Sequence, residues 1–76
     1  PNPGAWFLYM GERYKILKAI SSELKGEKGK VLDNDLTIAC KSKSIKIIEI
    51  QRQGKNKQSA SEFLLGSKIK RETLLN

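Results

Sequence analysis

Two apolar segments, residues 13–20 and 45–51, change the phase of their hydrophobic alternation midway. The residues are Tyr14 and Ile16 followed by Leu17 and Ala19, and Ile45 and Ile47 followed by Ile48 and Ile50. Because successive side chains of a strand point to opposite faces, β-bulges at Ile16-Leu17 and Ile47-Ile48 would return these residues to one face. Bulges also bend strands, as a small barrel requires. The alternative is strands buried on both faces, which a chain of 76 residues can hardly cover.

The remaining pattern predicts further short strands and one helix. Strands are expected at 5–10, 30–32 and 36–40, and the tail containing Ile69, Leu74 and Leu75 is a candidate for a last one. Turns are expected at Gly11-Glu12, with Gly first as a type II′ turn requires, and at Asp33-Asn34-Asp35. Ser59 and Glu62 have the spacing of a capping box, which predicts a short helix ending at Gly66. The residues therefore indicate an all-β chain with one short α-helix.

The composition indicates a single small domain over residues 1–76 and excludes several chemistries. With one cysteine, Cys40, and no histidine, the chain has no intramolecular disulfide, no Cys/His zinc site and no histidine base. This cysteine usage fits a reducing, cytoplasmic location. No apolar run has the length of a membrane span, and no catalytic or metal-ligating constellation is visible. Because Pro1 is not an initiator residue, we expect the chain to be a fragment of a longer protein.

The charge balance favours an anionic partner. Fifteen Lys and Arg residues stand against eight Asp and Glu residues, a net charge of +7. A barrel could gather cations of separate segments into one groove for phosphates. The candidate phosphate contacts are Arg13, Lys15 and Lys18 on the first segment, Lys41, Lys43 and Lys46 before and on the second, and Arg52, Lys55 and Lys57 after it. The alternatives are an acidic lipid surface as the partner, or ordinary solvated strand faces without a partner.

Aromatic and amide residues offer weaker signals. Trp6, Tyr9 and Tyr14 could stack on unpaired bases, but an aromatic residue on a short strand of a thin core favours packing. Gln53 and Asn56 could contact base edges or simply be solvated in the loop at 51–57. Cys40 continues an apolar face and is expected to be buried.

Two blocks of the sequence resemble a known family. The first is Pro1-Asn2-Pro3-Gly4-Ala5-Trp6, followed by Gly11, Arg13, Lys15, Ile16, Lys18 and Ala19. The second comprises Gln51, Gly54, Lys55, Ser59, Ala60, Glu62, Phe63, Leu64 and Gly66. In order and spacing, both blocks are similar to the C-terminal domain of methionyl-tRNA formyltransferases.

The resemblance implies a small open Greek-key, OB-like barrel of five to six strands that serves as a tRNA-binding accessory domain. Such a domain would position initiator methionyl-tRNA for N-formylation by an N-terminal catalytic domain that uses 10-formyltetrahydrofolate. This segment would then hold no catalytic residue, cofactor or metal and contact no membrane. The alternatives are the C-terminal domain of a sugar-nucleotide or folate formyltransferase, a free-standing basic OB-like nucleic-acid binder, or a module that only docks to a catalytic domain.

Overall fold

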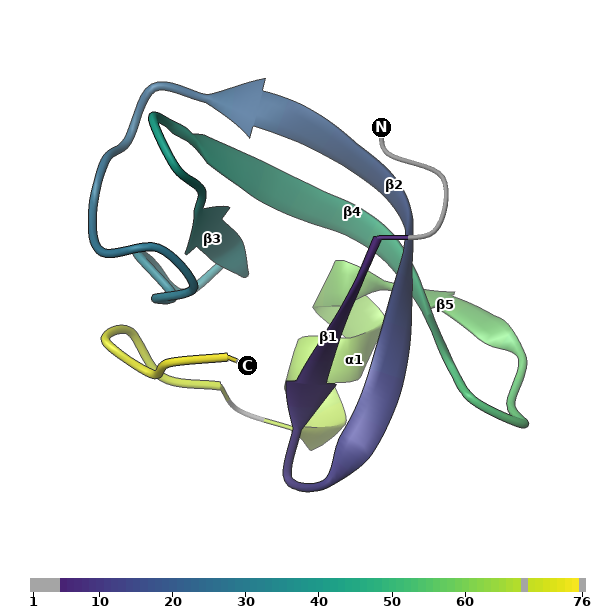
Figure 1. Cartoon of the computed structure of the whole chain (residues 1–76). Helices are drawn as coiled ribbons and strands as arrows, with labels where there is room; N and C mark the ends of the chain where they lie inside the picture. The colour runs from purple at the N-terminus through teal and green to yellow at the C-terminus, as the bar shows by residue number, and fades with distance from the viewer. Residues whose placement is uncertain (1–4, 68, 76) are drawn as a thin grey trace.

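The computed structural model describes residues 5–67 and 69–75, which form a curled antiparallel sheet and one short helix (Figure 1). The elements are β1 (Trp6–Tyr9), β2 (Glu12–Ser22), β3 (Thr37–Ala39), β4 (Ser44–Arg52), β5 (Lys57–Ser59) and α1 (Ala60–Gly66). Strands β1, β2 and β4 are neighbours in that order, and β3 and β5 pair with different parts of β4. The sheet forms a half-barrel, which confirms the predicted all-β, OB-like fold with one helix.

Both predicted bulges lie at the middle of the β2–β4 ladder. Ile16 pairs with Ile50, and Ala19 pairs with Ile47, but the register shifts between these pairs. Leu17 and Ile48 have no partner in the ladder. Each strand thus places an extra residue at the same level, and the two long strands bend together. As a result Ile47 and Ile50, three positions apart, are both buried in the core.

The core fills the concave side of the sheet. Tyr14 stacks on Phe7 with ring centroids 5.2 Å apart and meets Phe63 of α1 edge-on at 5.0 Å. Tyr9 is half-buried and packs edge-on against Phe63, so Tyr9 and Tyr14 serve packing as expected. The buried cluster comprises Phe7, Tyr14, Val31, Leu36, Ile38, Ile47, Ile50, Ala60, Phe63, Ile69 and Leu75. The helix and the tail therefore close the open side of the half-barrel.

The β1–β2 turn lies one residue earlier than predicted. Tyr9 and Glu12 form the last pair of the hairpin, so Met10 and Gly11 are the two turn residues. Their φ angles are 53° and 77°. Positive φ at both positions is the type I′ condition, which matches the twist of the flanking strands better than other turns. The prediction of Gly11-Glu12 was wrong because Met10 accepts the left-handed conformation.

Two other segments differ from the prediction. Residues 30–32 form only isolated bridges, Lys30 with Leu74 and Val31 with Ile38, so neither this segment nor the tail is a full strand. The strand β5 was not predicted, because its polar residues show no hydrophobic alternation. Cys40 follows β3 and is half-buried rather than buried, because the strand ends at Ala39 before the turn.

The first turn of α1 is held by the predicted capping box. The N–H of Glu62 donates to Oγ of Ser59 at 3.1 Å, and the N–H of Ser59 donates to Oε1 of Glu62 at 3.1 Å. We expect Ser59→Ala to lower the free energy of unfolding by about 1 kcal/mol, since one helical N–H loses its acceptor. In a domain of this size, the thermal midpoint measured by circular dichroism should fall by about 4–8 °C. Ser61→Ala is the control, because the Ser61 hydroxyl lies 3.1 Å from Oγ of Ser59 but bonds no backbone group of the helix, and equal effects of the two changes would contradict the cap.

The predicted Asp33-Asn34-Asp35 turn is organised by the carboxylate of Asp33. Its Oδ1 accepts from the N–H groups of Asp35 at 2.9 Å and Thr37 at 3.1 Å, and its Oδ2 accepts from the hydroxyl of Thr37 at 2.7 Å. Partial burial alone would raise the pKa of Asp33. The hydrogen bonds of Thr37 and Asp35 and the nearby charge of Lys46 outweigh burial and hold the pKa below its ordinary value of 3.8.

A lowered carboxyl pKa makes the stability of the fold depend on pH. The ionised Asp33 stabilises the folded state fully above the unfolded pKa of 3.8, and this stabilisation is lost as the pH falls through the lower folded pKa. We expect Asp33→Asn to cost about 1–2 kcal/mol at pH 7, since hydrogen bonds to a charged acceptor are replaced by weaker bonds to a neutral amide. Urea titrations from pH 7 to pH 2 should show this difference shrinking below about pH 4. A difference that stays constant across this range would contradict the role of the charge.

Candidate nucleic-acid interface

A row of side chains crosses three strands on the face of the sheet turned away from α1. Trp6 of β1 pairs with Lys15 of β2, and Lys15 pairs with Gln51 of β4. Directly opposed residues of a sheet share a face. Tyr14 next to Lys15 points inward to Phe63, so the row points outward. Arg13 lies on the same outer face two residues before Lys15, and its C=O accepts from the N–H of Gln53 at 3.2 Å.

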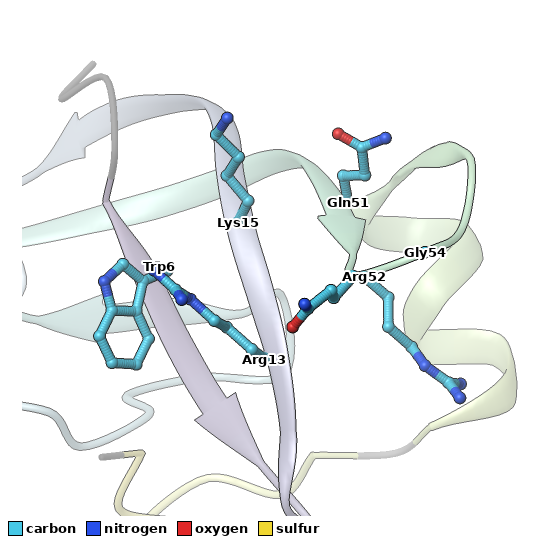
Figure 2. A pocket seen from close by; sticks show the side chains of 7 residues that line it. Trp6, Arg13, Lys15, Gln51, Arg52 and Gly54 are labelled. Atoms are coloured by element: carbon cyan, nitrogen blue, oxygen red, sulfur yellow. The ribbon is translucent and has the colours of Figure 1, made fainter.

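These residues border an open cleft of about 470 Å³, named here the Trp6 cleft (Figure 2). Its lining consists of Trp6, Arg13, Lys15, Gln51, Arg52, Gln53 and Gly54. Three of the seven are permanently cationic at neutral pH, and two are amides that both donate and accept hydrogen bonds. The lining suits a polyanion that also carries groups able to form hydrogen bonds with the two amides.

Trp6 lies in this cleft rather than in the core, where the sequence had placed it. The guanidinium carbon of Arg13 lies over the indole, 4.4 Å from the ring centroid, and 46% of Trp6 remains exposed. Of neighbouring residues in β1, Phe7 is the one that enters the core. Alternation along the strand then sends Trp6 outward. The expectation of core packing for Trp6 was wrong because one strand cannot bury both residues against a single core.

A second hollow, named here the helix-side hollow, lies on the other side of the β4–β5 turn. It has a volume of about 550 Å³, and its cations are Arg52, Lys55 and Lys57. Arg52 borders both hollows, and its side chain points away from Trp6 (Figure 2). Its Nε lies 3.2 Å from Oε1 of Glu12. Arg52 therefore lies at the junction of the two hollows, whereas Lys55 and Lys57 border the helix-side hollow alone.

The structure brings five of the nine predicted cations to these hollows and leaves four elsewhere. Lys18 and Lys46 lie further along the sheet, opposite Glu49 and Ile20 respectively. Lys41 and Lys43 belong to the turn before β4, at the opposite end of this nine-residue strand from the β4–β5 turn. Lys43 also lies 3.4 Å from a carboxylate oxygen of Glu23.

The described part of the chain contains neither a metal-binding cluster nor a membrane-spanning helix. Residues 5–67 and 69–75 hold no group of three or more His, Cys, Asp or Glu side chains placed to bind a metal ion. Within the same ranges, no helix has the length and apolar character needed to cross a membrane. The Trp6 cleft and the helix-side hollow are therefore the candidate binding sites in the described part of the chain.

Comparison with known proteins places the chain in a family. Residues 1–68 match the model of the formyl transferase, C-terminal domain. A methionyl-tRNA formyltransferase of Pelagibacter ubique is 60% identical over 70 residues, covering 91% of this chain and 23% of the relative. Methionyl-tRNA formyltransferases of Paramagnetospirillum magneticum and Ruegeria pomeroyi are 44% and 45% identical, each over 99% of this chain and 25% of the relative.

The matched part of these relatives is their C-terminal part, and the chain spans about a quarter of their length. The match covers both sequence blocks and both hollows. The chain belongs to the formyl transferase C-terminal domain family.

Proposed function

We propose that this chain is the tRNA-binding accessory domain of a methionyl-tRNA formyltransferase. In this role it positions initiator methionyl-tRNA while a separate N-terminal catalytic domain formylates the amino group. The observation that carries the proposal is the gathering of Arg13, Lys15, Arg52, Lys55 and Lys57 around two open hollows at one end of the sheet. Support also comes from relatives that are named for methionyl-tRNA.

The charge pattern favours contact with the phosphate backbone. Lysine and arginine side chains that neutralise phosphates release condensed counterions, which gives affinity without a sequence-reading helix. The β4–β5 turn adds a close approach for the backbone, because Gly54 has no Cβ and adopts a φ of 80°. A nucleic acid larger than the domain could reach beyond the two hollows. We propose that it makes additional phosphate contacts with four outlying lysines, Lys18, Lys41, Lys43 and Lys46.

We assign catalysis and the formyl donor to the remainder of the enzyme. The chain has no histidine to act as a base, and the two hollows are open rather than enclosing a folate. In this proposal residues 1–76 form one domain of a longer cytoplasmic enzyme, and 10-formyltetrahydrofolate binds its catalytic domain. Because this domain would contribute binding energy alone, its removal should mainly raise the apparent KM for tRNA.

The salt dependence of tRNA binding tests the proposal. The five contacts at the two hollows, counted without the four outlying ones, predict a slope of about −4 to −5 in a plot of log affinity against log salt. Between 50 and 200 mM salt, the affinity should therefore fall by a factor on the order of 10² to 10³. We expect a dissociation constant of about 10⁻⁴ to 10⁻⁶ M at physiological salt, measured by the anisotropy of labelled tRNA. An isotherm that does not move with salt would sink the proposal.

Two competition arms separate the alternatives. Phosphate contacts do not read sequence, so initiator and elongator tRNAs should compete equally for this chain. A preference for initiator tRNA beyond about tenfold would place specificity in this domain. Anionic phosphatidylserine vesicles replace the tRNA in the second arm, and tighter binding to vesicles than to tRNA would favour a membrane-docking module.

A further inference from the structure

Trp6 is the one exposed aromatic side chain of the chain, and it lies on a cationic face. The other four aromatic residues are buried or half-buried in the core. Trp6 instead stands in one row with Lys15 and Gln51 and borders the open cleft. An exposed indole beside cations is the arrangement on which proteins stack unpaired bases of single-stranded nucleic acid.

The contact between Arg13 and Trp6 prepares this surface. The guanidinium carbon lies over the indole, 4.4 Å from the ring centroid, so the two groups form a cation–π pair before any ligand binds. Both an indole and a guanidinium plane accept a base on their free surface. The cleft of about 470 Å³ falls within the volume range of small-molecule sites, which is roughly 300–1,000 Å³. The site is thus shaped, charged and large enough for one nucleotide.

We propose that the Trp6 cleft binds an unpaired nucleotide, whose base stacks on the Trp6–Arg13 pair and whose phosphate is bound by Lys15. The inference rests on the proposed function and specifies the part of the RNA that the cleft takes, namely a base that is free of a double helix. A base inside a duplex is covered by its neighbours and has no free face for Trp6. Every base has such a face, so we expect little base preference.

The fluorescence of Trp6 tests the inference directly, because it is the only tryptophan of the chain. The probes are hexauridylate, whose bases are unpaired, and a stable RNA duplex, compared at equal phosphate concentration. Both are titrated into the 76-residue chain after its cooperative thermal unfolding is verified. We expect hexauridylate, and not the duplex, to change the emission of Trp6 in a saturable way. If hexauridylate causes no saturable change in the emission of Trp6, the inference is overturned, and no variant is needed to show it.

Variants separate stacking from charge. Trp6→Leu should weaken hexauridylate binding by about 5- to 100-fold and leave duplex binding unchanged, since stacking on one base has that value. Trp6→Phe should retain most of the affinity. Leu8→Ala is the matched control, because Leu8 is an exposed apolar residue of the same strand and face but does not border the cleft. Equal losses for hexauridylate and duplex in Trp6→Leu would mean that Trp6 only positions Arg13, and the inference would fail.

A parallel tRNA titration distinguishes this inference from the proposed function. Salt-dependent tRNA binding without any effect of Trp6→Leu on hexauridylate would refute the stacking site and leave the tRNA-binding role standing. Stacking of hexauridylate on a chain that does not bind tRNA would refute the tRNA-binding role and leave the stacking site standing.

Discussion

Replacing Lys55 and Lys57 together by Glu should lower the affinity for tRNA by about 10- to 100-fold at physiological salt. Both lysines are exposed and border the helix-side hollow. A unit charge 4 Å from a phosphate contributes about 1 kcal/mol in water, and reversal replaces each attraction by a repulsion that salt partly screens. The free energy of unfolding should change by no more than about 0.5 kcal/mol, as is usual for exposed positions. Anisotropy titrations and urea unfolding of the same preparations check both parts.

A second double variant controls for net charge. Lys25 and Lys28 are exposed in the segment that follows β2, at the opposite end of that strand from Arg13. Lys25→Glu with Lys28→Glu changes the net charge by the same amount but should reduce tRNA affinity far less, since these residues border neither hollow. Equal losses for both pairs would show that binding follows total charge rather than this surface. A collapse of stability with unchanged affinity would assign Lys55 and Lys57 a structural role.

The parts of the fold that local patterns specify were predictable. The two bulges follow from the phase change of the apolar pattern, although Leu17 and Ile48, which were expected to share the inward face, lie outside the core cluster. The capping box follows from a hydroxyl and a carboxylate three residues apart. The Met10-Gly11 turn was not predictable in the same way, because a methionine with positive φ is uncommon and only the pairing of Tyr9 with Glu12 imposes it. Short segments such as 30–32 take their conformation from the tail packed beside them, which is far away in sequence, as the bridge between Lys30 and Leu74 shows.

The candidate site shows a similar division. The strand assignment placed Arg13 and Lys15 correctly on β2, whereas Arg52 and Lys57, which were expected in a loop, lie in β4 and β5. In the prediction from sequence, Lys41 and Lys43 were grouped with these cations. They lie apart because the turn before β4 and the turn after β4 are at opposite ends of that strand. Trp6 could not be placed from sequence. Trp6 and Phe7 are both apolar, and which of them is buried depends on which face of β1 packs against the core.

The bulge in β4 decides which isoleucine side chain is buried, and replacing the buried one gives the largest expected effect on stability. Ile47 is 1% exposed and belongs to the core, whereas Ile48 is half-buried and has no partner in the ladder. Ile47→Ala should lower the free energy of unfolding by about 2–5 kcal/mol, through lost burial and the cavity that remains. A domain of this size has roughly 4–11 kcal/mol in total, so the variant should lose a large fraction of its stability.

Ile48→Ala is the matched control, because it removes the same atoms one residue further along the strand. Uninterrupted alternation from Ile50 would put Ile48 in the core and Ile47 on the outer face, which reverses the order of the two effects. With the bulge, Ile48→Ala should cost about 1 kcal/mol or less, and Ile47→Val should fall between, at about 0.5–1.5 kcal/mol. Urea midpoints at pH 7 rank the three variants. A larger loss in Ile48→Ala than in Ile47→Ala would contradict the bulge, and with it the bend that turns the sheet around α1.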